Sequence, residues 1–211
     1  MKKGNDLIET LKDEYILLTI DPSLQCTGYS ILMVDNNGEK NINNKHVKII
    51  EYGMIPTKGL SIGQELMLFE KIISEVIEKY NPDYITSEQM FAGNNRNTGM
   101  KLGYIHGILQ LLAAKNYLNV VYYSVLTAKS TTLDGLKMKK DDGSKKTGDE
   151  MKQEVAEKIF EIFGKESFQK EFTNDVTDAI SIGVTFIKKD GKEIEKVKKK
   201  RKTAKKKNTK K

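Results

Sequence analysis

Four acidic residues stand where predicted structural elements end or begin. Asp21 follows a bulky, strand-favouring run at 15–20, and Glu88 closes a second strand-like run at 83–88. Asp175 and Asp178 are three residues apart at the start of a helical segment, so their carboxylates project from one face. Converging carboxylates repel one another unless cations lie between them, and hard oxygen ligands favour Mg²⁺ or Mn²⁺. Two such ions about 3.5–4 Å apart would activate a water molecule and stabilise the leaving oxygen of a phosphodiester.

Each acid also has a purely structural explanation. Asp21 precedes Pro22, and Asp-Pro commonly starts a turn. Asp175 and Asp178 would satisfy free N–H groups and the dipole of a helix N-terminus, worth about 0.3–1 kcal/mol each. The metal-site interpretation depends on the combination, because two strand ends and one helix start all present carboxylates while nearby basic residues are sparse.

The elements that must position these acids follow from hydrophobic patterning. A β-hairpin is expected over 15–34, and its first strand is apolar on both faces, as in a central strand covered on both sides. A third strand at 47–55 completes an antiparallel meander, and the strand at 83–88 follows a helix and is expected to pair in parallel. The remaining expected segments are helices at 61–80, 99–114, 151–163 and 174–188, a strand at 120–125, polar loops at 89–98 and 129–132, and a mobile insertion at 136–150.

Charge is distributed unevenly along the 211 residues, a length that suits one domain with appendages. The segment 196–211 holds eleven Lys or Arg residues and no acid, whereas residues 1–195 hold 25 basic and 29 acidic residues, a net charge of −4. Such a run cannot bury apolar surface, so we expect a disordered tail. The tail would bind polyanions by counterion release, or serve only as a solubilising or localisation segment.

Cysteine and histidine usage limits the chemistry further. Cys26 is the single cysteine and excludes an internal disulfide, and the two histidines, His46 and His106, leave no cluster with zinc spacing. The longest apolar runs are strand-length, and the N-terminal segment is charged throughout, so neither a membrane span nor a signal peptide is expected. The sequence therefore predicts a soluble, cytoplasmic protein.

Four segments resemble those of a known family: IDPSLQCTGYSIL around Asp21, ITSEQMF around Glu88, KLGYIHG after it, and NDVTDAISI around Asp175 and Asp178. With the element order β-β-β-α-β-α-β-α over residues 15–188, the chain resembles the RuvC Holliday-junction resolvases of the ribonuclease H-like superfamily. The resemblance implies an α/β fold with a mixed five-stranded sheet and helices on both faces. It also implies an endodeoxyribonuclease of DNA recombination and repair, with the four acids as catalytic metal ligands for Mg²⁺ or Mn²⁺ and with four-way junctions and forks as substrates.

The resemblance implies roles for three further residues. Phe91 matches an aromatic residue that stacks on an unpaired base at the crossover, although core packing is an equally good explanation of this ring. Lys129 and Lys152 match basic residues that face the DNA backbone or the scissile phosphate, and Lys152 is also expected to be catalytic.

Several features depart from the bacterial pattern. Ser23 stands where the bacterial enzymes usually have glycine, and the charged lead at 1–14, the insertion at 136–150 and the tail at 191–211 are additions to a nuclease domain at 15–190. These additions resemble those of a phage-encoded relative that acts without branch-migration partners.

Two glycines suggest how the chain associates. Gly103 and Gly107 are four residues apart on one stripe of the predicted helix at 99–114 and would permit close approach of another helix. The helix would use them to pack on its own sheet, or to contact a second copy in a homodimer that is two-fold symmetric.

Three other functions would also use some of these features. Asp21 followed by Thr27-Gly28 also begins the phosphate-binding hairpin of sugar-kinase-like and actin-like ATPases, but these need a second domain for which the chain has no room. A non-catalytic branched-DNA-binding protein would gain affinity by losing the four acids. A ribonuclease H acting on RNA–DNA hybrids shares the same chemistry and stays open as an alternative.

Overall fold

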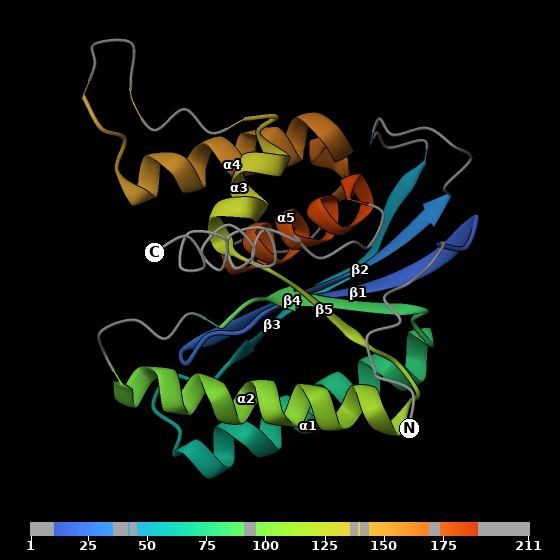
Figure 1. Ribbon diagram of the computed structural model, residues 1–211, viewed down its shortest axis with the longest axis vertical. Coiled ribbons are helices and arrows are strands. Elements are labelled where there is room, and N and C mark those ends of the chain that lie inside the picture. Colours follow the sequence, from blue (N-terminus) through green and yellow to red (C-terminus); the bar gives the residue numbers. More distant parts are fainter. Residues whose placement is uncertain are drawn as a thin grey trace, which may run out of the picture.

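The strand β1 (Glu14–Asp21) lies at the centre of a five-stranded sheet (Figure 1). The computed structural model describes residues 11–35, 42, 46–90, 96–135, 139, 144–168 and 174–189. β2 (Cys26–Asp35) pairs antiparallel with β1, and β3 (Val47–Pro56) pairs antiparallel with β2. β4 (Tyr84–Glu88) joins the other side of β1 in parallel, and β5 (Val120–Tyr123) extends it in parallel, giving the order β3-β2-β1-β4-β5.

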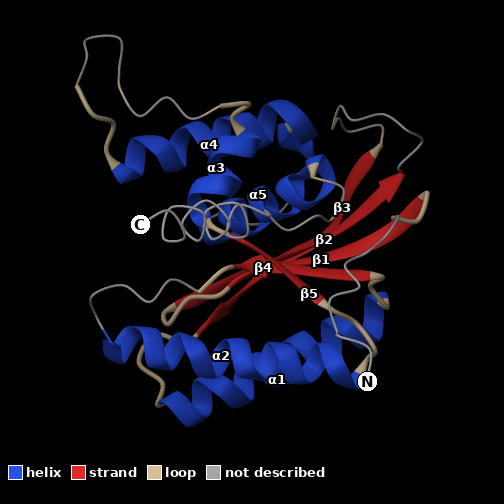
Figure 2. Cartoon of the chain, in the orientation of Figure 1, coloured by secondary structure: helices blue, strands red, loops and turns tan. Residues whose placement is uncertain are grey.

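Helices cover both faces of this sheet (Figure 2). One face carries α1 (Ile62–Tyr80) and α2 (Arg96–Lys115). The other carries α3 (Val125–Thr132), α4 (Gly148–Phe163), the short 3₁₀ helix Lys165–Ser167 and α5 (Asn174–Lys188). Because strand side chains alternate between faces, Leu18 and Ile20 pack against α1 and α2, whereas Tyr15 and Leu17 pack on the α5 side.

The expected fold class is confirmed, as are the antiparallel meander and the parallel pairing of β4. Three local expectations were wrong. The segment 129–132 is the end of α3 and not a polar loop, because Ser124 caps a helix that starts at Val125, and β5 accordingly ends at Tyr123. α4 starts at Gly148 and not at residue 151, because Thr147 and Glu150 form a capping box.

The ends of the other helices and strands differ less from those expected from the sequence. α2 begins at Arg96, three residues before the expected start, and Glu14 belongs to β1 and not to the charged lead. Residues 1–10, residues 136–138 and 140–143 of the insertion expected at 136–150, and the tail at 191–211 lie outside the described residues, so the expectations for them stay predictions. Among the described helices, none combines the length and the apolar composition that crossing a membrane requires.

Two glycines allow α5 to lie directly on the central strands. A Cβ added to Gly28 of β2 would fall 2.1 Å from the backbone oxygen of Asp175 at the start of α5. A Cβ added to Gly183 would fall 2.7 Å from Cγ2 of Thr19 and 2.6 Å from Cδ1 of Leu32. Real Cβ atoms do not approach other atoms so closely, so α5 keeps this position only while both residues are glycine.

Replacement of Gly28 tests this contact. Gly28→Ala forces the start of α5 away from β2, and we expect a loss of about 1–3 kcal/mol in the free energy of unfolding, measured by urea denaturation. Gly63→Ala is the control, because nothing lies within 4 Å of a Cβ added at Gly63 in α1. Equal stability of wild type and Gly28→Ala would contradict the contact.

Candidate active site

The alternation of the central strands brings two acids to the same place. Asp21 is the last residue of β1 and is only 7% exposed, and it lies on the α5 side with Leu17 and Thr19. In the parallel register of β1 with β4, Ile20 is the partner of Ser87, so Asp21 and Glu88 are the next residues along the two strands. Their side chains share a hydrogen bond. Two carboxyl groups can do so only when one of them carries a proton.

The first turn of α5 adds the other two acids. The close approach of the Asp175 backbone to Gly28 places this turn over the strand position that pairs with Asp21. Both Asp175 and Asp178 interact electrostatically with Asp21, and Asp178 also interacts with Glu88. The four acids that the sequence singled out therefore gather at the carboxyl ends of β1 and β4.

Burial among like charges changes the protonation of these acids. Burial raises the pKa of Asp21 well above its usual range, and the hydrogen bond to Glu88 and the charges of Glu88, Asp178 and Asp175 act in the same direction. The pKa of Glu88 is also raised, first by burial and then by Asp178, against the opposing effects of the Asp21 hydrogen bond and of Lys129. Because the two carboxyl groups share a hydrogen bond, they titrate as a pair and hold one proton between them.

Two lysines partly balance this negative charge. Burial raises the pKa of Asp178, and the positive charges of Lys129 and Lys152 oppose that rise. Lys152 lies on α4, one turn beyond the capping box of that helix. Lys129 lies on α3, is only 8% exposed and also acts on Glu88. The structure therefore turns Lys129 toward the acids, and its expected role of facing the DNA backbone or the scissile phosphate stays a prediction.

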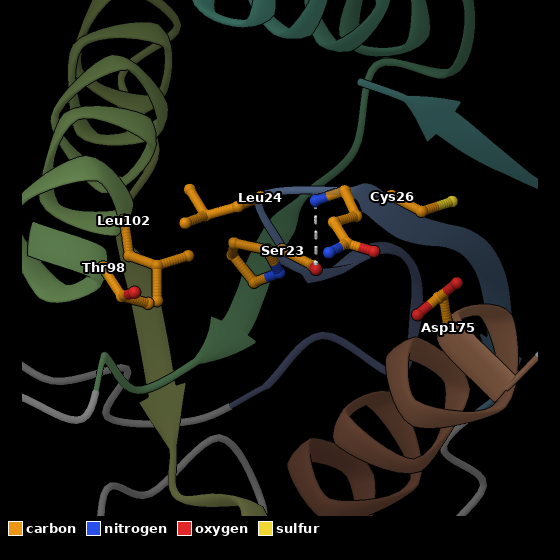
Figure 3. A pocket seen from close by; sticks show the side chains of 8 residues that line it. Ser23, Leu24, Cys26, Thr98, Leu102 and Asp175 are labelled. Atoms are coloured by element: carbon orange, nitrogen blue, oxygen red, sulfur yellow. Dashed lines mark hydrogen bonds between the residues drawn. The ribbon is translucent and has the colours of Figure 1, made fainter. Parts of the chain in front are cut away.

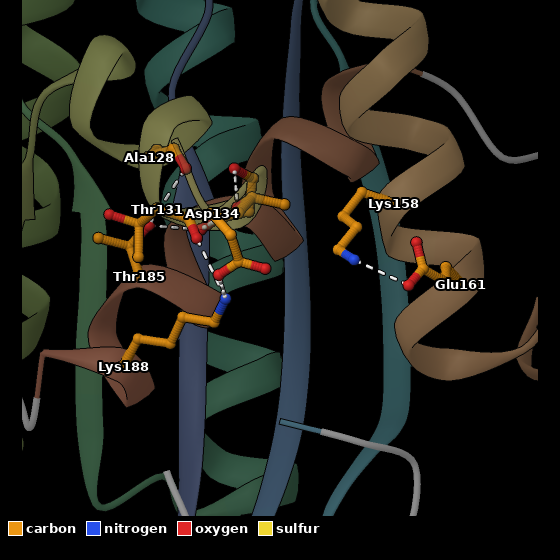
Figure 4. A network of polar contacts seen from close by, with 9 residues as sticks. Ala128, Thr131, Asp134, Lys158, Glu161, Thr185 and Lys188 are labelled. Atoms are coloured by element: carbon orange, nitrogen blue, oxygen red, sulfur yellow. Dashed lines mark hydrogen bonds and ion pairs between the residues drawn. The ribbon is translucent and has the colours of Figure 1, made fainter. Parts of the chain in front are cut away.

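The position of Lys129 depends on polar contacts between α3 and α5. The hydroxyl groups of Thr132 and Ser181 lie 2.8 Å apart, and both residues are buried. Figure 4 shows the next contacts along these helices, where the Thr185 hydroxyl donates to the Ala128 carbonyl at 3.5 Å and Lys188 pairs with Asp134 at 2.6 Å. These contacts hold α3 against the helix that carries Asp178.

The donor set fits a hard divalent cation, since it consists of carboxylate oxygens and carries more negative charge than Lys129 and Lys152 can balance. Within the ranges that the structure describes, however, no three acidic, histidine or cysteine side chains stand in an arrangement that could hold a metal ion. Binding would therefore require side-chain rotation, and the Asp21–Glu88 hydrogen bond is the contact that a cation would replace.

Of two further residues, one was predicted and one was not. Phe91 lies outside the described residues, so its stacking role stays a prediction. Cys26, which the sequence brought forward only in connection with disulfides, lies close enough to Asp175 for the two groups to interact electrostatically. Burial, followed by the negative charge of Asp175, raises the pKa of the Cys26 thiol to about 11. Its position five residues after Asp21, where β2 returns alongside β1, was the signal that could have identified it.

Comparison with known proteins places these features in a family. Residues 17–186 match the family model described as crossover junction endodeoxyribonuclease RuvC. The protein of that name from Dictyoglomus turgidum is 29% identical over 175 residues, covering 82% of this chain and 97% of the relative. The relative from Caldicellulosiruptor saccharolyticus is 26% identical over 172 residues, covering 81% of this chain and 91% of the relative.

The fold is also found among solved structures at low sequence identity. Thermus thermophilus RuvC in complex with a Holliday junction substrate superimposes with a TM-score of 0.61 at 15% identity, over 82% of this chain and 93% of that one.

The raised pKa of Asp21 predicts a gain in stability when its charge is removed. A carboxyl whose pKa is higher in the folded than in the unfolded state contributes most stability below its unfolded pKa, near 3.8, and loses that contribution as pH rises through its folded pKa. Asp21→Asn removes the carboxyl that ionises as pH rises and keeps an N–H donor toward Glu88. The metal-free variant should therefore be more stable than wild type at pH 8. A gain of about 1 kcal/mol would raise Tm by about 2–4 °C.

The measurement is thermal unfolding with EDTA between pH 4 and pH 8, where the gain should shrink toward pH 4. The control is Asp134→Asn, since the Lys188 hydrogen bond lowers the pKa of Asp134, and that variant should not gain stability. Asp21→Asn less stable than wild type at pH 8 would contradict the raised pKa of Asp21.

Proposed function

We propose that this chain, which belongs to the RuvC family of crossover junction endodeoxyribonucleases, is an endonuclease that nicks branched DNA such as Holliday junctions with Mg²⁺ or Mn²⁺. The observation that supports this proposal most is the buried Asp21–Glu88 pair under the first turn of α5. Such an arrangement destabilises the protein unless a cation is bound, so it is expected where metal-dependent chemistry occurs.

Each side chain has a part in this proposal. Asp21, Glu88, Asp175 and Asp178 would hold the cations, and the proton that Asp21 and Glu88 share would be released when they bind. The bound ions would supply an activated water and stabilise the charge that develops on the leaving oxygen. Lys152, which lies near Asp178 and is half-buried, would contact the scissile phosphate. Lys129 would fix the orientation of Glu88 and Asp178 from the interior.

Replacement of single acids tests the catalytic assignment. Asp21→Asn and Glu88→Gln each remove a ligand and a charge but keep the shape, so nicking of a four-way junction in Mg²⁺ should fall by about two orders of magnitude or more while junction binding survives. Glu161→Gln is the control, because Glu161 pairs with Lys158 on the surface of α4 and should cut at the wild-type rate.

The assay compares a four-way junction, a fork, a linear duplex and an RNA–DNA hybrid on denaturing gels. Faster cutting of the hybrid than of the junction would favour the ribonuclease H alternative. Full cleavage by either acid variant would contradict the proposed ligands.

The proposal also includes a homodimer, which an apolar stripe on α2 supports. Met100, Tyr104 and Leu111 are 55%, 45% and 50% exposed and lie on the same side of the helix as Gly107. A Cβ added at Gly107 would meet nothing within 4 Å, whereas one at Gly103 would lie 3.7 Å from the sulfur of Met90. A stripe of this kind suits a contact between two copies, which would present two active sites to opposite strands of a junction.

Charge placed on the stripe tests the dimer. Leu111→Glu puts a carboxylate in the apolar contact and should weaken association by roughly 30-fold or more, the factor that 2 kcal/mol confers. Gly107→Leu should act similarly without unfolding the monomer, since the space around Gly107 is open. The control is Leu126→Glu, at a residue 61% exposed on the opposite face of the sheet. Light scattering that finds the wild type monomeric at micromolar concentration would contradict the dimer.

A further inference from the structure

A cavity of about 460 Å³ lies beside the candidate active site (Figure 3). The turn between β1 and β2, residues 22–25, forms one side together with Cys26 at the start of β2, and Thr98 and Leu102 of α2 form another. Asp175 at the start of α5 is the remaining lining residue. The cavity and the carboxylate site therefore share one wall, because Asp175 belongs to both.

The backbone of this turn is held in place by hydrogen bonds. The Gln25 carbonyl accepts from the Thr57 N–H at 2.9 Å and the Lys58 N–H at 3.1 Å, and the Leu24 carbonyl accepts from the Thr57 hydroxyl at 3.1 Å. Within the turn, the Ser23 N–H donates to the hydroxyl of Thr27 at 3.2 Å. A turn fixed in this way presents the side chains of Leu24 and Gln25 to the cavity without further ordering.

The lining chemistry selects against phosphate and for a neutral planar group. Among the described residues that line the cavity, none is a lysine or an arginine, and Asp175, the one charged residue among them, is negative. Leu24 and Leu102 point toward each other and offer apolar contact, as Figure 3 shows. Ser23, Gln25 and Thr98 offer hydroxyl and amide groups at the edges. Apolar walls with a few polar groups at the rim match a nucleobase, which has apolar faces and hydrogen-bonding edges.

We propose that this cavity binds one unstacked nucleobase of the strand being cut, from a nucleotide adjacent to the scissile phosphate. The inference rests on the proposed function, because the acids fix where that phosphate must lie. A base at a strand crossover costs less to unstack than one inside a regular duplex. Gln25, which both donates and accepts hydrogen bonds, would make cutting depend on the identity of that base.

Fluorescence of 2-aminopurine tests for the unstacked base. The probe is placed in turn at each nucleotide flanking the scissile phosphate of a four-way junction, and the junction is bound by the full-length Glu88→Gln variant so that it stays uncut. One position should brighten by at least about twofold on binding. Adding Leu24→Ala and Gln25→Ala together should remove this rise, whereas adding Leu60→Ala should not. Leu60 is 37% exposed and does not line the cavity.

A second readout uses cleavage. Four junctions that differ only in the base at the brightened position are cut by wild type and by Gln25→Ala. The ratio of the best to the worst rate should fall by about fivefold in the variant, the factor that one good base contact confers.

The outcomes separate this inference from the proposed function. A bound junction that brightens at neither flanking nucleotide, or that brightens equally in the cavity variant, overturns the base-binding cavity even if the wild type nicks junctions. Failure of Glu88→Gln to bind the junction, together with a wild type that cuts no branched DNA, overturns both.

Discussion

The repulsion between carboxylates buried at the ends of β1 and β4 is the constraint on which the rest of the structure depends. Asp21 is almost fully buried, shares a proton with Glu88 and is approached by two further acids from α5. Without a cation, this arrangement lowers the stability of the fold at neutral pH, because burial and like charge both disfavour the ionised form. A destabilising arrangement of this kind is expected where the binding of a ligand stabilises the protein by more than the repulsion destabilises it.

The surrounding elements maintain that arrangement. Gly28 and Gly183 let α5 lie close against the central strands, so that its first turn reaches the acids. The hydroxyl contacts of α3 with α5 hold Lys129 in the interior, where its charge limits the repulsion but does not cancel it. The site is therefore built from side chains on regular strands and helices whose positions are set by packing, and rigid elements of this kind preorganise catalytic groups.

Much of the fold and of the candidate site could be predicted from the sequence, because the informative features are local. The double-sided apolar pattern of β1, the strand that ends at Glu88 and the Asp-x-x-Asp start of α5 each mark an element boundary with an acid on it. α3 was missed because its eight residues show no apolar period, and its start depends on a cap by Ser124. The inward position of Lys129 and the proximity of Cys26 to Asp175 arise from the tertiary packing of α3 and β2 against α5, which no local pattern contains.

The most direct test of the account is calorimetric titration of the DNA-free protein with Mn²⁺ and with Mg²⁺ at neutral pH. The account predicts binding by the wild type, about tenfold or greater weakening in Asp178→Asn and in Glu88→Gln, and wild-type affinity in Asp134→Asn, whose carboxylate pairs with Lys188 away from the site. Equal affinity in all four proteins would contradict the claim that the carboxylates at the ends of β1 and β4 and at the start of α5 are gathered to hold a divalent cation.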